Sequence, residues 1–160
     1  MSRDVPAWLR RWRPASRAAD RTSPVTPERL AAVVADRGYR VRGEPDASLT
    51  GLWDTYLFRV RLTGSSGALL SVVGFWGHQV PPELHGPLAQ AVNDWNRDRV
   101  WPTVVLDHGG AGVRTEVLTD LSLGATDAQV AEALEIGLVS GVQMLTALTA
   151  AMPPVEDLES

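Results

Sequence analysis

Three histidines, His78, His85 and His108, are the side chains best suited to proton transfer or metal binding at neutral pH. His78 and His85 lie seven residues apart in a proline-rich segment, and His108 opens a glycine-rich stretch. A zinc site needs three or four ligands that close around the ion, and no third histidine or acid shares this spacing. We therefore expect no metal, no cofactor and three histidines in surface loops. An enzyme with a histidine-lined pocket remains an alternative, and a deep pocket around these histidines would be its sign.

The stretch His108–Gly112 resembles the glycine motif that supplies an oxyanion hole in lipases and esterases. The Gly-x-Ser-x-Gly nucleophile motif that accompanies it in those enzymes is absent. Residues of alternating polarity flank the glycines on both sides, so a hairpin turn explains them better.

Neither the paired acids nor the basic residues of the sequence indicate an enzyme. Asp94 and Asp98 are four residues apart on a predicted helix, but Arg97 and Arg99 lie beside them, which indicates a solvated salt-bridge patch. All fifteen basic residues are arginine, so a Walker lysine or a Schiff-base lysine is excluded. There are no cysteines, which excludes disulfides and thiolate chemistry and fits a reducing compartment. We predict a protein that is not an enzyme.

The segment Asn93–Pro102 combines tryptophan, amide and charge where a helix must end and a strand begin. We expect its asparagines to cap the helix and its Trp-Pro pair to start the strand. Tryptophans beside turns and arginines are typical of interface hot spots, whereas others of the six belong to the core. The residues predicted to bind a partner protein are Trp53, Trp95, Arg97, Arg99 and Trp101.

Charge is distributed unevenly along the chain. Residues 1–24 hold six arginines against two aspartates, a net charge of +4, and the other nine arginines face seventeen acids, a net charge of −8. The acidic body argues against a nucleic-acid surface there. As an alternative function, the arm at residues 1–24, which also carries two tryptophans, would bind an anionic membrane or nucleic acid.

One uncharged run, Ile136–Met152, is seventeen residues long and contains glycine, serine and threonine. A membrane-spanning helix needs roughly 20 mostly apolar residues, so we expect a buried helix here and no integral membrane protein. The first thirty residues lack the apolar core of a signal peptide, and we expect a cytoplasmic protein.

Hydrophobic periodicity predicts an α+β fold with an antiparallel sheet of about five strands and helices packed on it, in the order α-β-β-β-α-β-β-α. The arm is followed by a domain at 25–153 and an acidic tail at 154–160. In the second strand, Phe58 and Val60 face one way and Arg59 and Arg61 the other. The predicted elements are a helix at 26–38, strands at 39–44, 55–62 and 68–76, a helix at 88–98, strands at 103–107 and 113–121, and a helix at 126–152.

The chain resembles the YbjN family, particularly its single-domain actinobacterial form, over about residues 25–153. The strongest match is the run Asn93-Asp94-Trp95-Asn96-Arg97-Asp98-Arg99 followed by Trp101-Pro102. Further matching positions are Gly38-Tyr39, Trp53-Asp54, Leu57-Phe58, Glu116, Leu121, Gly124, Thr126-Asp127, Gln129 and Met152-Pro153.

This resemblance implies a fold similar to type III secretion chaperones, often dimeric, in a family described as sensory-transduction regulators without established catalytic residues. Relatives often carry a lysine where this chain has Thr103, so a role of that lysine is in doubt here. Together, the residues and the resemblance predict a protein-binding module with a chaperone-like or regulatory function. Its partner is an unknown protein, with a homodimer as an alternative.

Overall fold

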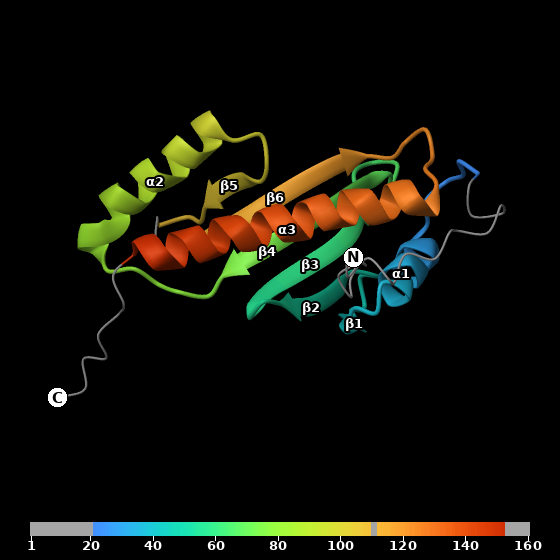
Figure 1. Ribbon diagram of the computed structural model, residues 1–160, viewed down its shortest axis with the longest axis horizontal. Helices are drawn as coiled ribbons and strands as arrows, with labels where there is room; N and C mark the ends of the chain where they lie inside the picture. Colours follow the sequence, from blue (N-terminus) through green and yellow to red (C-terminus); the bar gives the residue numbers. More distant parts are fainter. Residues whose placement is uncertain (1–20, 110–111, 153–160) are drawn as a thin grey trace, which may run out of the picture.

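The computed structural model describes residues 21–109 and 112–152, in which three α-helices pack on one antiparallel sheet (Figure 1). The α+β class and the order of the helices agree with the prediction. The elements are α1 (Pro27–Asp36), β1 (Val41–Gly43), β2 (Leu49–Trp53), β3 (Tyr56–Thr63), β4 (Leu69–Trp76), the 3-10 turn η2 (Pro82–Leu84), α2 (His85–Asp98), β5 (Thr103–Leu106), β6 (Val113–Asp120) and α3 (Asp127–Ala151).

The sheet has six strands in the order β1-β2-β3-β4-β6-β5, so β4 and β6 join the two halves of the chain. The predicted number of about five strands was one too low because β2 was missed. The segment 45–51 is polar and rich in turn-forming residues, yet Leu49–Trp53 pairs with β3 over five residues.

Local backbone geometry explains why β2 was missed. A two-residue turn joins β2 to β3, and both of its residues, Asp54 and Thr55, have positive φ, 47° and 74°. Hairpin turns of this kind usually carry glycine or asparagine, which this turn lacks. Gly51 further weakens the strand pattern, although the ring of Trp53 lies only 2.9 Å from where its Cβ would be.

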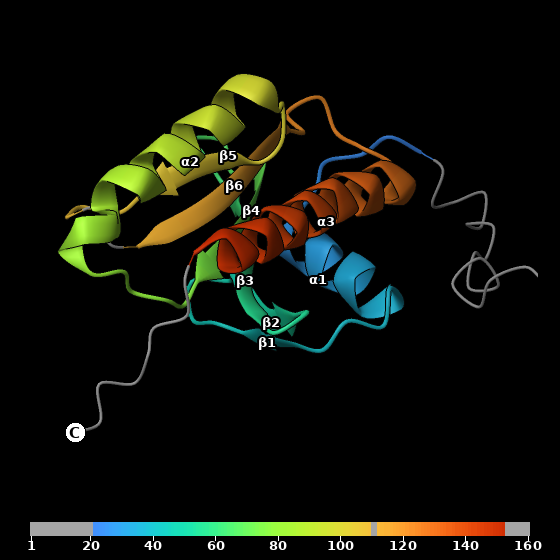
Figure 2. The ribbon, with the colours of Figure 1, turned by 60° about the vertical axis from the view of Figure 1, so that its left-hand side comes forward.

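α3 runs across β4 and β6 and supplies much of the core (Figures 1 and 2). Gly137 and Gly141 allow this close packing, because a Cβ on Gly137 would lie 2.5 Å from the Val72 side chain. α3 is also the one helix in the described part of the chain that is long and apolar enough to cross a membrane. Its contact with the sheet supports the expected reading as a buried helix.

The helix ends largely follow the predicted signals. Thr126 and Gln129 form the predicted capping box of α3, and Thr26 caps α1 through the Arg29 backbone N–H. α2 begins at His85, three residues earlier than predicted, because Pro87 falls in its first turn, where proline is tolerated.

Contacts of the domain extend upstream of the boundary predicted at residue 25. Ser23 forms a β-bridge with Ala125, and the Arg29 guanidinium donates to the backbone carbonyls of Ser23, Pro24 and Ala125. Residues 23 and 24 therefore contact the domain. The rest of the arm up to residue 20 and the tail lie outside the described residues.

One face of β4 is more open than the other. The nearly continuous apolar run of this strand is typical of burial on both faces, yet Val73 and Phe75 are only half-buried. Their neighbours Leu70, Val72 and Trp76 point toward the helices and are buried.

Candidate partner-binding site

α2 ends at Asp98, and the chain turns through four residues into β5. The Arg99 N–H donates to the Trp95 carbonyl at 2.9 Å, and the backbone of Arg99 is extended, so the helix ends there. Pro102, preceded by a cis peptide bond, is buried at the start of β5. Residues 99–102, the link between α2 and β5, therefore connect a helix and a strand that both contribute buried side chains to the core.

Asn96 fixes the end of α2 to the sheet edge. Its side-chain amide donates to the Val104 carbonyl and accepts from the Val104 N–H, both at 2.9 Å. It thus takes the position that another strand would occupy beside β5. The expected helix-capping role of the asparagines was wrong for Asn96, because its side chain bonds to the strand.

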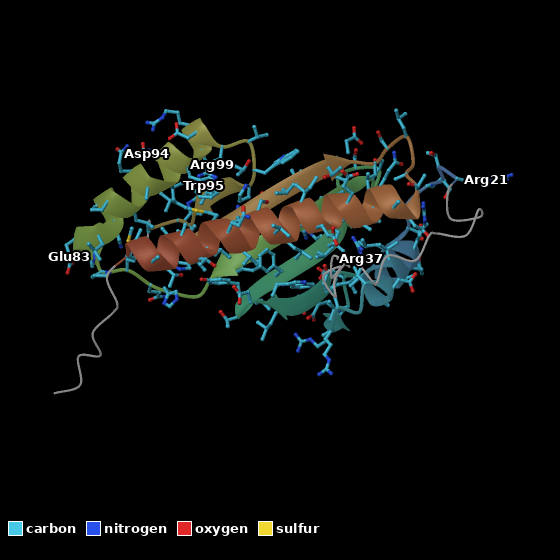
Figure 3. The ribbon with its side chains drawn as sticks, in the orientation of Figure 1. Arg21, Arg37, Glu83, Asp94, Trp95 and Arg99 are labelled. Atoms are coloured by element: carbon cyan, nitrogen blue, oxygen red, sulfur yellow. The ribbon has the colours of Figure 1, made fainter. Side chains whose placement is uncertain are left out.

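Trp95 and Arg99 are stacked at the end of α2 (Figure 3). The Arg99 guanidinium carbon lies 4.8 Å from the centre of the Trp95 ring, a cation–π geometry. Trp95 is half-buried against the core rather than fully inside it, and its Nε1–H is buried without a hydrogen-bond partner among the described residues. The guanidinium therefore rests on a side chain anchored in the protein.

Arg97 binds the two aspartates that flank it. Its Nη1 donates to Asp94 at 2.9 Å and its Nε to Asp98 at 2.8 Å. The hydrogen bond from Arg97 lowers the pKa of the Asp98 carboxyl, and the same pair raises the pKa of Arg97. The predicted salt-bridge patch is confirmed, because Arg97 is ion-paired with both aspartates.

Two apolar side chains on the link are exposed. Trp101 is 52% exposed and Val100 81% exposed. We call the set Trp95, Arg97, Arg99, Val100 and Trp101 the α2–β5 corner. Val100 was missed from the sequence, where the only available signal was its position between an arginine and the Trp-Pro pair.

Trp53 does not belong to this corner. β2 is separated from β5 by three strands, so the two lie about 19 Å apart at the usual strand spacing of about 4.8 Å. Its ring packs edge-on against Tyr39 at 5.4 Å and against Phe58 at 5.8 Å. The five residues predicted from the sequence therefore do not form one surface, and Trp53 is a packing residue.

The histidines do not converge either. His78 packs on the Trp76 ring at 5.1 Å, the His85 ring lies 3.2 Å from the Val80 carbonyl, and His108 is exposed in the turn after β5. Among residues 21–109 and 112–152, no three histidines and acids are grouped as metal ligands. A shallow hollow of about 680 Å³ beside β1 and β2 contains none of these histidines and is lined by Tyr39, Arg40, Val41, Arg42, Thr50, Gly51 and Leu52.

The sequence and fold identify the family. A sequence model of the YbjN family, described as "putative bacterial sensory transduction regulator", matches residues 26–150. The chain belongs to the YbjN family. The segment that decides the resemblance, Asn93–Pro102, is the same one that forms the corner.

A solved structure shows the same YbjN fold. The crystal structure of YbjN from E. coli, described as "a putative transcription regulator", is similar with a TM-score of 0.67 at 13% sequence identity, covering 81% of this chain and 95% of that one. At this identity the likeness concerns the fold alone. No curated protein matches the chain. Thr103 is exposed at the start of β5 next to the corner.

Proposed function

We propose that this YbjN domain is a non-enzymatic regulatory module of the cytoplasm that binds a partner protein through the α2–β5 corner. The observation that carries the proposal is the exposure of Trp101 and Val100 on a link whose two ends are fixed to the core. An exposed tryptophan on a fixed backbone loses little conformational freedom when a partner covers it.

The arginines of the corner add specificity to this apolar contact. Arg99 is already stacked on Trp95, so its remaining N–H donors are presented in a fixed direction. Tryptophan and arginine together are the residue types most enriched at interface hot spots. A partner that offers an apolar pocket with a carboxylate or backbone carbonyls at its rim would fit this surface.

The proposal of a role without catalysis rests on how the reactive side chains are used. His78 contacts a tryptophan ring, and Asp94 and Asp98 are both paired with Arg97. Each of these groups already has a structural partner, which supports binding rather than acid–base chemistry.

Affinity isolation from the native host tests the proposal. The wild-type protein and the variant Trp101→Ala are compared with Leu123→Ala, which removes another exposed apolar side chain in the turn after β6. We expect a partner that is retained by wild type and Leu123→Ala and lost with Trp101→Ala. An unchanged set of partners for Trp101→Ala would refute the corner as the binding surface. Sedimentation of the purified proteins shows whether that partner is a second copy of the chain.

A further inference from the structure

The face of the sheet that points away from α3 is a second candidate surface. Phe58 and Val60 of β3 are fully buried toward the helices, so Leu57, Arg59 and Arg61 point the other way, and all three are exposed. On β6, Thr115 likewise lies next to Gly141 of α3, so its neighbours in sequence face outward. We call this side of the sheet the open face.

α2 does not cover the open face. Val104 of β5, which is hydrogen-bonded to Asn96 of α2, is paired with Thr115 and therefore points to the α3 side, where it is 3% exposed. The helices of the described part of the chain thus lie on one side of the sheet. On the other side, the strands β2, β3, β4 and β6 present every second side chain.

An apolar strip crosses the middle of the open face. Leu52 is opposite Leu57, and Leu57 is opposite Phe75, so their side chains are direct neighbours across three strands. Leu52 is 69% exposed and Leu57 46% exposed. Val73 and Leu118 (52% exposed) continue the apolar surface on β4 and β6. Contiguous exposed apolar side chains of this kind mark interaction surfaces more often than single ones do.

Two arginines without an ion pair among the described residues border this strip. Arg59 lies opposite Thr50 and Val73, and Arg61 lies opposite Ser71. They are two residues apart on one strand, so their Cα atoms are about 7 Å apart. This spacing suits two carboxylates on alternate residues of an extended segment.

The other charges near the open face are largely satisfied. Arg42 is bound to Glu44, and Arg114 lies 3.4 Å from Asp107. Glu116 and Asp120 lie on β6 opposite Val73 and Leu69, two strands away from the arginines of β3. Arg59 and Arg61 make no ion pair among the described residues, although Arg59 lies within electrostatic reach of Glu44 and Asp46. Arg40, which lines the hollow beside Leu52, adds a third arginine without an ion pair in the described part of the chain.

We propose that the open face binds an acidic amphipathic segment of a partner protein. Its apolar side chains would cover Leu57 and Phe75, and its carboxylates would pair with Arg59 and Arg61. Charge complementarity of this type sets specificity and accelerates association. The surface is separate from the α2–β5 corner, so either can fail without the other.

Two other occupants fit the charges less well. A second copy whose two-fold axis passes through β3 would bring the arginines of both copies together, which is unfavourable for like charges. A nucleic acid needs several clustered cations along its backbone, whereas Arg59 and Arg61 share this face with Glu116 and Asp120.

A synthetic peptide of about ten residues that contains the pattern Leu-Ser-Glu-Ser-Glu is a direct probe, because an extended chain then presents the leucine and both glutamates on one face, as Leu57, Arg59 and Arg61 are presented on β3. Binding is followed by amide chemical shifts of the labelled protein. We expect shifts at Leu57, Arg59 and Phe75, and a Kd about tenfold weaker for Arg61→Glu. Arg21→Glu is the matched control, because it makes the same change of charge at an exposed position outside the sheet. A peptide with lysine in place of glutamate should not bind.

Several results would overturn the proposal. These are no binding of the glutamate peptide, equal binding to wild type and Arg61→Glu, equal binding of the lysine peptide, or shifts confined to the helices. A dimer in sedimentation that Arg61→Glu dissociates would assign the face to a second copy instead. Binding to phosphatidylglycerol vesicles that depends on Arg61, without binding of the peptide, would assign it to a membrane.

Discussion

Asn96 and Val104 are joined by two hydrogen bonds, one from the side-chain amide to the backbone carbonyl and one from the backbone N–H to the side-chain oxygen. The last turn of α2 is thereby fixed to the outer edge of the sheet. The pairing also occupies one position of an edge strand that would otherwise be open to another chain. The four residues between α2 and β5 are consequently held at both ends, and Val100 and Trp101 project from them.

Removal of this pairing should destabilise the protein. In Asn96→Ala the backbone groups of Val104 lose both partners, and we expect the free energy of unfolding to fall by roughly 1–3 kcal/mol. Asn93→Ala is the control, since Asn93 is exposed on the same helix and makes no side-chain hydrogen bond among the described residues. Urea unfolding measures both. Equal stability of the two variants would show that the pairing contributes nothing.

The glycines of α3 should be intolerant of even one methyl group. In Gly137→Ala the new Cβ would lie 2.5 Å from the Val72 side chain, in a sheet that cannot move freely. Overpacking of this kind typically costs about 1–3 kcal/mol, more than the roughly 1 kcal/mol that alanine gains over glycine in a helix.

Gly86 in α2 provides the comparison for that experiment. A Cβ at this position would meet nothing within 4 Å, so Gly86→Ala should leave stability unchanged or slightly raised. Thermal unfolding of the two variants decides the point. If Gly137→Ala is as stable as Gly86→Ala, α3 does not pack on β4 as closely as described.

The Glu44 carboxylate should make stability depend on acid pH. It accepts from the Thr50 hydroxyl at 2.7 Å and from Arg42 at 2.7 and 2.9 Å. These bonds, the Thr50 bond first, lower the pKa of Glu44 below its ordinary value of 4.5. Because the folded state favours the ionised form, this stabilisation is present above pH 4.5 and is lost as the pH falls through the lowered pKa.

Thr50→Val tests this assignment. The substitution removes the hydroxyl donor and should raise the pKa of Glu44 toward 4.5, as followed by NMR titration of the side-chain carboxyl. The pKa of Asp120, lowered by its hydrogen bonds from Ser122 at a distant turn, should stay the same. A shift of both groups, or of neither, would contradict the proposed cause.

Local sequence patterns predicted much of the fold. The alternation of Phe58 and Val60 with Arg59 and Arg61 predicted the two faces of β3, and the Thr126 and Gln129 pair predicted the start of α3. These signals are short-range, since strand pleat and helix capping act within a few residues. β2 was missed because its turn uses Asp54 and Thr55 with positive φ rather than glycine.

The candidate site was predictable only in part. The sequence run from Trp95 to Trp101 stays together in space because it spans one helix end and one short link. Trp53 was grouped with it on residue type alone, and only the strand order shows that it is four strand positions away. The bonding of Asn96 to the sheet edge could not be predicted from local patterns either, because its hydrogen-bond partner Val104 is on β5, beyond the turn that follows α2.

Site-directed photocrosslinking in the native host tests the central claim most directly. A photoreactive phenylalanine replaces Val100 in one protein and Leu123 in another, both exposed apolar positions, and Trp101 is left intact. The proposed binding through the α2–β5 corner predicts a discrete protein adduct at position 100 that is absent at position 123. The same adducts at both positions, or none at 100 while the protein remains folded, would contradict it.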